Sequence, residues 1–553
     1  MCYRQYLTTA AIALMSVSTG ASLDSAVRLA RPGQDLAVAI RAIVDTTPEP
    51  VSAPAQLIAL YSVGQYAPLW LDSSGRPIDD AQGAIRILAA APTEGLDPSD
   101  YSALPLQQWA TALTSLHAAS IQEVASFDVA LSRDFLRYIH DLRFGRVDPG
   151  TVGFRLPHRE PDDLAARLRG ALTEHRVGAF ANELSPSIPL YRRLRVALIT
   201  YRKLAMDPTL RPLQLTETPV RPGDRSDAVP QLGRLLIALG DVPADDINAS
   251  ELVYQGSLVD GIKRFQLRHG LEADGVIGKS TSAALRVPLS WRVRQIELAM
   301  ERLRWLPSLG GERFIAVNIP MFRVWGLEGS NGEYRPSFAT DVIVGRALNT
   351  RTPVLMEDLE DIVFRPYWNI PTSILRGEIL PAISLTPDYL QRHHMEIVAG
   401  QSDDSAVVPI TPATLDQLRQ GKLRVRQRPG ADNALGLVKF VFPNDENVYM
   451  HGTPEPELFK RARRDFSHGC IRVADPVGLA EWVLAAKPDW DRDRIIAAMD
   501  TSGPTRVPLD RPIRVFLFYL TAVVLPEDDT IHFAEDLYGH DARLDGYLRA
   551  AGS

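Results

Sequence analysis

The chain is 553 residues long, which predicts three or four domains at about 100–200 residues each. Hydrophobic residues make up 45% and charged residues 23%, which is ordinary globular composition and excludes wholesale disorder or a collagen-like fibre. A net charge of −7 argues against nucleic acid as a partner and against a cationic membrane-binding patch. The only cysteines are Cys2 and Cys470, so a disulfide framework and a cysteine-rich metal site are also excluded.

Residues 1–22 have the pattern of a secretory signal peptide. Arg4 precedes a short apolar stretch that ends at Val17, and small residues follow it. Because this stretch is shorter than the ~20 apolar residues of a spanning helix, we expect cleavage and export. An uncleaved segment would instead anchor the protein in the membrane. Cleavage would leave Cys470 as the only thiol, and such a cysteine is either accidental or a reactive centre.

Residues 35–215 are predicted to form a helical scaffold domain. Apolar side chains recur at helical spacing, for example between Leu57 and Tyr61 and between Phe127 and Ile139. Turns rich in Gly, Pro and Asp separate the expected helices. No residues in this region have catalytic spacing, which indicates a structural role.

Residues 220–286 are predicted to form a small accessory module of three short helices. Leucines at helical spacing precede Gly240, which is a plausible end of the first helix. The unit resembles a peptidoglycan-binding domain of the three-helix type through Pro222-Gly223-Asp224, Phe265-Gln266, Gly270-Leu271, Asp274-Gly275 and Gly278. The alternative is that these residues only form the turns and core of the bundle.

A connecting helix is expected at 290–310, and the pattern then changes to strands. Short runs rich in β-branched and aromatic residues predict a mostly β domain over 312–503. Asp475 and Pro476 are typical of a helix N-cap and first helical residue. The tail, 504–553, is predicted to form a closing hairpin extension. The fold class is therefore multidomain α+β.

Two histidines and the cysteine lie close together in the β domain. His451 ends a β run, and Cys470 lies in a glycine-containing turn just before the Asp475 helix. A thiol with a pKa of ~8.5 is mostly protonated at neutral pH, so a nucleophilic cysteine needs a base or a cation nearby. His451, on a neighbouring strand, is the better candidate base, because His468 is expected at the rim. The Gly469 and Cys470 amides are candidates for an oxyanion hole.

Two other interpretations of these residues stay open. A lone cysteine is often a small buried hydrophobe. His451, His468 and Cys470 could also bind zinc, although the chain has no C-x-x-C or H-x-x-x-H clamp and no evident supporting carboxylate. The residue chemistry favours Cys–His acyl transfer without a metal or cofactor.

The same segment resembles the L,D-transpeptidase catalytic domain of the YkuD type. Fifteen residues separate His451 from Ser467-His468-Gly469-Cys470, as in that family's signature. Further matching positions are Val448-Tyr449, Tyr367-Trp368-Asn369-Ile370-Pro371, Val344-Gly345-Arg346 and Thr352-Pro353. With the helical scaffold and the small module, the arrangement resembles the large Gram-negative YcbB-like branch along nearly the whole chain.

The resemblance implies a role for each matching residue. Cys470 would be the nucleophile, His451 its base, and the Gly452 carbonyl would orient the imidazole. Tyr449 would lie beside the oxyanion hole. The remaining positions implied to shape the turn or face the substrate are Ser467, His468, Gly469, Arg472 and Trp368. Residues 373–435 would form a lid over the site.

The resemblance also implies a reaction. The protein would act in the periplasm on tetrapeptide stems of peptidoglycan, as donor and acceptor, and cross-link their third residues with release of D-alanine. Carbapenems would acylate the same cysteine, and a penicillin-binding protein could be a partner. The alternatives are an L,D-carboxypeptidase or wall-protein amidase that uses water as acceptor, and a wall-binding scaffold in which Cys470 is idle.

Overall fold

A computed structural model describes most of the chain. The described residues are 32–47, 56–115, 119–210, 213–215, 217–246, 252–307, 311–330, 333–348, 350–400, 402–525, 527 and 529–551. The expected signal peptide, 1–22, lies outside them. Across the described segments, none of the helices combines the length and the apolar character that crossing a bilayer requires.

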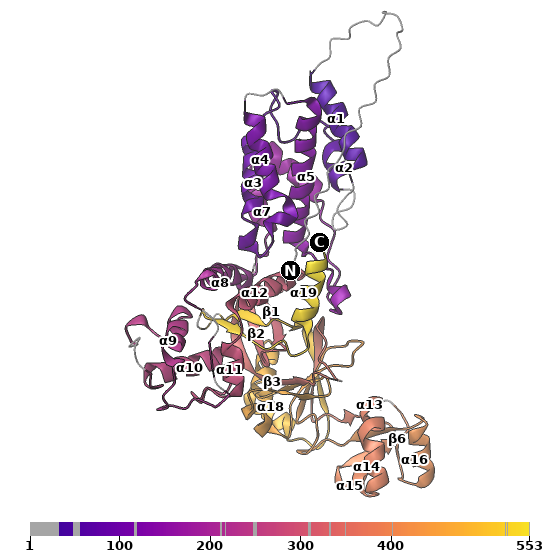
Figure 1. Cartoon of the computed structure of the whole chain (residues 1–553). Helices are drawn as coiled ribbons and strands as arrows, with labels where there is room; N and C mark the ends of the chain where they lie inside the picture. Colours follow the sequence, from indigo (N-terminus) through magenta and orange to yellow (C-terminus); the bar gives the residue numbers. More distant parts are fainter. Residues whose placement is uncertain are drawn as a thin grey trace, which may run out of the picture.

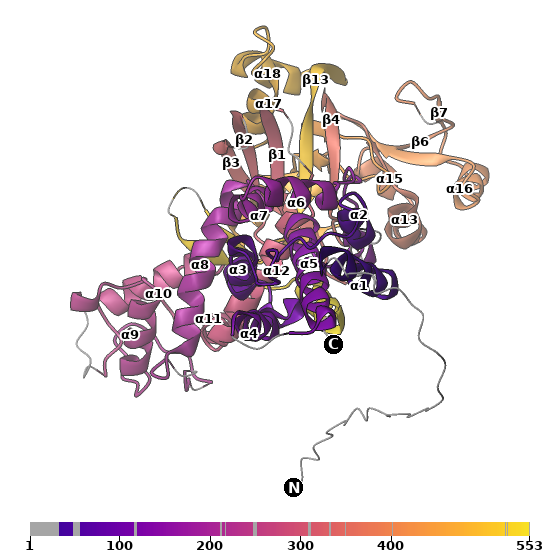
Figure 2. The same ribbon diagram turned by 90° about the horizontal axis from the view of Figure 1, so that it is seen from above.

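The predicted fold class is confirmed: a helical N-terminal scaffold, a helical module and a mostly β domain are distinct parts of the structure. Figure 1 shows the scaffold helices as a column above the sheet. The module and the lid extend from opposite sides of the molecule in both ribbon views (Figures 1 and 2).

The scaffold column is a bundle around one long central helix. Its helices are α1 (Pro32–Thr46), α2 (Gln56–Ser62), α3 (Asp79–Ala89), α4 (Ala103–Thr114), α5 (Ile121–Phe144), α6 (Leu164–Thr173) and α7 (Val177–Leu184). A capping box of Ser120 and Glu123 starts α5. Asp128 on α5 is fully buried and accepts hydrogen bonds from the Trp70 amide (2.8 Å) and the Tyr61 hydroxyl (2.5 Å). The carboxylate thus fixes the segment before α3 to the central helix.

The module has the three predicted helices within its described residues: α9 (Val229–Ala238), α10 (Ser257–Arg268) and α11 (Lys279–Leu285). Their apolar faces form one small core around Leu236 and Ile262, both fully buried. Arg268 and Asp241 form a buried ion pair at 2.6 Å inside the module.

Two further helices join the three parts. They are α8 (Pro189–Met206), which follows the scaffold, and α12 (Leu289–Arg304), which corresponds to the predicted connecting helix. The two pack together through a shared apolar cluster that includes Leu198 and Met300. Glu301 on α12 accepts hydrogen bonds from the backbone amides of Arg146 (2.5 Å) and Val147 (3.1 Å), which ties the scaffold to the connecting helix.

The mostly β domain is built on a nine-stranded sheet of order β11-β3-β12-β10-β9-β4-β13-β1-β2. The strands are β1 (Arg313–Asn318), β2 (Arg323–Ser330), β3 (Glu333–Gly345), β4 (Leu355–Phe364), β9 (Val438–Val441), β10 (Met450–His451), β11 (Asp465–Ser467), β12 (Ile471–Val473) and β13 (Thr505–Phe518). The first part of β3 pairs with β2, while its later residues pair with β12 and β11, so β3 closes the sheet on itself. Helices α17 (Pro476–Leu484) and α18 (Arg492–Met499) pack on it, and Asp475 caps α17 as predicted.

The hairpin predicted for the tail, 504–553, is confirmed between β14 (Ala522–Val524) and β15 (Ile531–Phe533), but the rest of the tail differs from the prediction. The strand β13 lies inside the main sheet, parallel to β1 and antiparallel to β4. Helix α19 (His540–Ala551) follows the hairpin. The apolar run of β13 has its partners nearly 200 residues earlier in the chain, at Phe314–Asn318, so local sequence could not reveal them.

The lid is a separate small layer with its own core. Strands β5 (Trp368–Asn369), β6 (Met395–Val398), β7 (Val407–Val408) and β8 (Arg424–Gln427) form a four-stranded sheet of order β5-β8-β6-β7. Short helices α13 (Thr372–Ile374), α14 (Leu380–Leu385), α15 (Tyr389–Arg392) and α16 (Pro412–Arg419) cover it. The expected boundary at 373 is too late, because β5 already pairs with β8 in the lid sheet.

Candidate active site

The polar face of three short strands forms the candidate site. On β9, β10 and β12, the side chains of Phe440, Met450 and Ile471 are fully buried in the core. Since side chains alternate along a strand, the neighbouring residues point to the opposite face. His451 pairs with Lys439 on one side and with Arg472 on the other.

Cys470 immediately precedes β12, opposite Tyr449 on the neighbouring strand. The Ile471 amide donates to the Tyr449 carbonyl at 3.0 Å, which fixes this register. The alternation therefore brings Cys470 to the same face as His451. The sulfur is half-buried and lies 3.9 Å from the Asn447 carbonyl oxygen.

The turn that carries Cys470 is held by short-range hydrogen bonds. The Ser467 hydroxyl donates to the Cys470 carbonyl at 2.5 Å, and the Gly469 amide donates to the Ser467 oxygen at 3.1 Å. Gly469 has φ +117°, a conformation that favours glycine, and its carbonyl accepts from the Thr352 hydroxyl at 2.8 Å. The sequence reasoning named Thr352 only as a matching position and gave it no such role.

The expectation that the Gly469 amide forms part of an oxyanion hole is not met in this conformation. That N–H is already bonded to Ser467, within the turn itself. The Cys470 amide is the other donor named from the sequence, and it stays the candidate.

His451 is buried and held in one tautomer. Its Nδ1 lies 2.6 Å from the Gly452 carbonyl oxygen. Because a carbonyl can only accept, Nδ1 carries the proton and Nε2 of the neutral ring has the free lone pair. Burial, together with the nearby charges of Arg472 and Lys439, lowers the pKa of His451 to about 3. The imidazole is thus neutral and able to accept a proton.

The thiol of Cys470 is surrounded by groups that act on its charge. Burial raises the pKa of Cys470, while hydrogen bonds from Tyr449 and the positive charges of Lys439 and Arg472 act in the opposite direction. Burial also raises the pKa of the Tyr449 hydroxyl, which interacts with both Cys470 and Trp368. The first strand of the lid, β5, therefore contacts the site through Trp368.

His468 is not part of the nucleophile's immediate surroundings. Its side chain is exposed, as the sequence suggested, and its Nε2 lies 2.6 Å from Glu378 in the lid. Arg472 forms a 2.6 Å ion pair with Glu455. The structure brings together Cys470, His451 and Tyr449, and it places His468 at the contact between the turn and the lid.

Lys439 is a residue of this site that the sequence reasoning missed. Its Nζ lies 3.9 Å from the ring centroid of Tyr449, and burial lowers the pKa of the ammonium group. The signal was present, because a lysine interrupts the apolar run Leu437–Phe442 and a strand there must point it away from the core.

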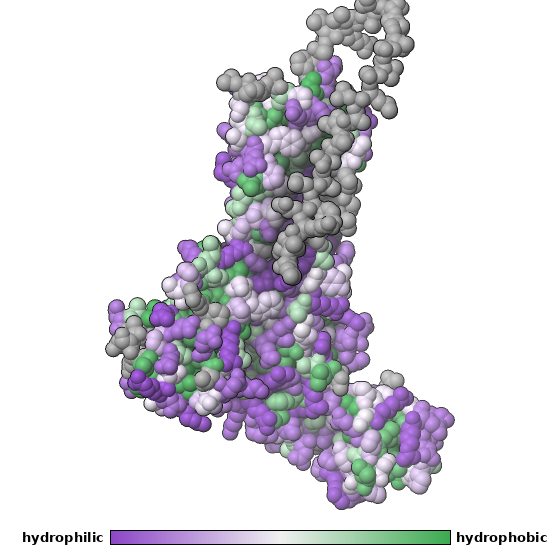
Figure 3. All heavy atoms as spheres, viewed as in Figure 1, coloured by the Kyte–Doolittle hydropathy of each residue, from purple (hydrophilic) through white to green (hydrophobic). Residues whose placement is uncertain are grey.

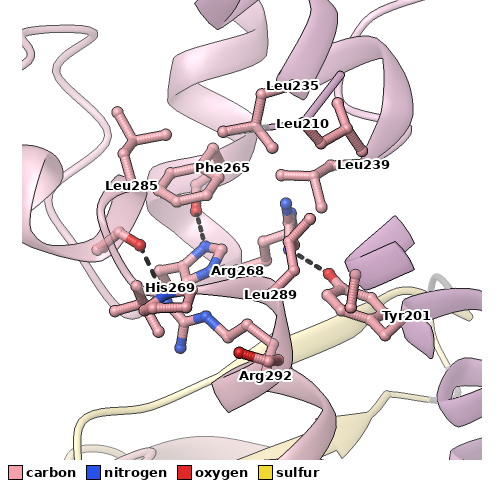
Figure 4. Close-up of a pocket in the computed structure, with 15 residues that line it drawn as sticks. Tyr201, Leu210, Leu235, Leu239, Phe265, Arg268, His269, Leu285, Leu289 and Arg292 are labelled. Atoms are coloured by element: carbon pink, nitrogen blue, oxygen red, sulfur yellow. Dashed lines mark hydrogen bonds between the residues drawn. The ribbon is translucent and has the colours of Figure 1, made fainter. Parts of the chain in front are cut away.

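Hollows that lie elsewhere among the described residues have other linings. One of about 180 Å³ lies between the module, α8 and α12, with a leucine-rich wall and a floor that includes Arg268, His269 and Arg292 (Figure 4). Polar residues cover most of the face shown in Figure 3. In the part of the chain that the structure describes, no three His, Cys, Asp or Glu side chains gather as a metal site would require.

Comparison with known protein families gives three matches in chain order. Residues 55–198 match a "Scaffold domain", residues 225–285 a "Putative peptidoglycan binding domain", and residues 312–507 the YkuD family, described as "L,D-transpeptidase catalytic domain". A protein of Haemophilus influenzae named "Putative L,D-transpeptidase" is 31% identical over 257 residues, which is 45% of this chain. The chain spans about half the length of that curated relative, 49% of it.

Proposed function

Since residues 312–507 belong to the L,D-transpeptidase catalytic-domain family, we propose that this protein cross-links peptidoglycan stem peptides between their third residues. The observation that carries the proposal is the arrangement of Cys470, Tyr449 and His451 on one face of two adjacent strands. The match of residues 225–285 to a peptidoglycan-binding domain supports the same polymer as substrate.

In the first half-reaction, the Cys470 thiolate attacks the carbonyl carbon between the third residue of a tetrapeptide stem and its terminal D-alanine. The thiol proton goes to Nε2 of His451, which the hydrogen bond to Gly452 leaves free to accept it. The carbon–nitrogen bond then breaks, and His451 returns the proton to the departing amine of D-alanine. A thioester on Cys470 remains.

In the second half-reaction, an amine of another stem's third residue attacks the thioester. The carbon–sulfur bond breaks, a new amide forms, and the proton lost by the amine passes through His451 to the sulfur. The Cys470 amide is the donor proposed for the oxyanion of each tetrahedral intermediate. The strand β5, which carries Trp368, would limit access of water to this thioester.

The setting of the reaction follows from the same proposal. The protein would be exported to the periplasm by its signal peptide, with a penicillin-binding protein as a possible supplier of trimmed stems. A carbapenem would acylate Cys470, because its β-lactam carbonyl offers the thiolate the same kind of electrophile.

The test is mass spectrometry of the products formed from disaccharide-tetrapeptide. We compare the wild type with Cys470→Ala and His451→Ala, and use His394→Ala, an exposed histidine of the lid, as the matched control. A dimer that lacks one D-alanine, formed by the wild type and the control but not by the two site variants, supports the proposal.

Tripeptide alone would instead support an L,D-carboxypeptidase with water as acceptor. The same dimer from the Cys470→Ala variant would contradict the covalent mechanism. Absence of every product, together with absence of a carbapenem adduct on Cys470, would contradict the proposed function as a whole.

A further inference from the structure

The Cys–His pair alone does not explain what stabilises the negative charge of the Cys470 thiolate. Burial raises the pKa of the Cys470 thiol, yet the thiolate is the nucleophile. In many Cys–His sites an imidazolium stabilises the thiolate, but here burial and two nearby cations keep His451 neutral at rest. A different, permanent positive charge is needed to hold the sulfur in its reactive form.

Lys439 is in position to supply that charge. It lies on β9, directly paired with His451, and points to the face that carries Cys470. Its Nζ packs over the ring of Tyr449 at 3.9 Å from the centroid, and the Tyr449 hydroxyl interacts with the sulfur. The Lys439 ammonium group and the Cys470 sulfur also interact electrostatically.

The other charged groups around the site are less suited to this role. Arg472 also acts on the sulfur, but it is engaged by Glu455 at 2.6 Å. Asp403 of the lid and Arg506 of β13 also act on the charge of Lys439, with opposite effects. Within the described residues no carboxylate forms an ion pair with Lys439, so its charge is left for the sulfur.

We propose that Lys439 is a positioning residue whose ammonium group is the permanent counter-charge of the Cys470 thiolate. This proposal rests on the proposed function, in which Cys470 is the nucleophile. When the S–H bond breaks and the proton moves to Nε2 of His451, the negative sulfur forms beside Lys439 and Tyr449. The lysine neither gains nor loses a proton in this step; it stabilises the charge that appears.

The test measures the thiolate directly, without turnover. The full-length protein is treated with iodoacetamide between pH 5 and pH 11, and the rate of alkylation is followed on the Cys470 peptide by mass spectrometry. This readout excludes Cys2, which lies in a different peptide. We compare the wild type with Lys439→Met and Lys439→Arg. The control is Lys460→Met, which removes an exposed lysine of the same domain.

Removal of the charge should move the midpoint of the alkylation profile upward by about 1 unit, since an opposite charge at close range shifts a pKa by this order. Alkylation at pH 7 should then be about tenfold slower in Lys439→Met and recover at high pH. Lys439→Arg and Lys460→Met should keep the wild-type midpoint. A circular dichroism spectrum that matches the wild type shows that the variant is folded.

Two results would overturn the proposal. One is an unchanged midpoint in Lys439→Met. The other is an equal shift in Lys439→Met and Lys439→Arg, which would mean that packing and not charge matters. Failure of the proposed function would look different, because wild-type Cys470 could show this profile and still form no dimer from disaccharide-tetrapeptide.

Discussion

The module and the lid are both attached to the catalytic domain, but they are held in different ways. The module meets α8, α12 and the β14–β15 hairpin through buried groups: Phe533 packs against Tyr201, and His269 stacks between Phe533 and Phe265. The lid has a separate core, and its contact with the Cys470 turn is the exposed pair of His468 and Glu378.

This difference indicates which part can move without unfolding. Buried aromatic and ionic contacts are costly to separate, whereas an exposed ion pair contributes on the order of 1 kcal/mol or less. The module is therefore held in a fixed position against the rest of the protein. The lid is the part whose position can change.

The largest expected effect comes from the module's buried ion pair. Arg268→Met leaves Asp241 buried without its partner, which should destabilise the module by about 3–5 kcal/mol. Hydrogen–deuterium exchange of α9 and α10 measures this as a loss of protection. Carbapenem acylation of Cys470 should stay near the wild-type rate, because the pair lies far from the site. Unchanged protection in α10 would contradict the interpretation that buried contacts hold the module in place.

A pH-dependent loosening of the module is the next effect. Burial lowers the pKa of His269 well below its ordinary value, and Arg268, Arg292 and His532 lower it further. The folded state therefore binds fewer protons than the unfolded state, so the module loses stability as the pH falls below about 6.5. The loss should approach about 1.4 kcal/mol per pH unit.

This slope can be measured by hydrogen–deuterium exchange of α10 between pH 7 and pH 4.5, with correction for the intrinsic exchange rate. His269→Gln removes the titrating group and should flatten the profile. Equal slopes in the variant and the wild type would show that other groups cause the loosening.

The smallest effect on stability is expected at the lid. Glu378→Gln removes the charge that faces His468 and should change the free energy of unfolding by about 1 kcal/mol or less. Expressed as a free energy, the change in the rate of Cys470 acylation should exceed the change in stability. The reason is that the contact joins the lid to the turn that carries Cys470. A double-mutant cycle with His468→Ala isolates the pair. A large loss of stability with an unchanged rate of Cys470 acylation would contradict the conclusion that the lid is held less firmly than the module.

The parts of this molecule that sequence could predict are those with local patterns. The three helices of the module have apolar residues at helical spacing, and Asp475-Pro476 marks the start of α17. The cysteine turn and His451 were identifiable because a glycine-containing turn and a histidine at a strand end are local features.

What sequence could not predict depends on pairing across long distances. The role of Lys439 follows only from its register against His451, and the use of the Gly469 amide follows only from the position of Ser467 in the folded turn. The lid sheet likewise begins at Trp368 because β8, nearly 60 residues later, supplies its partner strand.

The place of β13 in the sheet has a consequence for how the protein is made. A chain that is synthesised from its N-terminus contains His451 and Cys470 before it contains β13, the strand that joins β4 to β1. Until Thr505–Phe518 follows, no strand lies between β4 and β1. The two parts of the sheet are then joined through the pairing of β3 with β2. Closure of the sheet between β4 and β1 therefore depends on a segment near the end of the chain, which makes it a late step of folding.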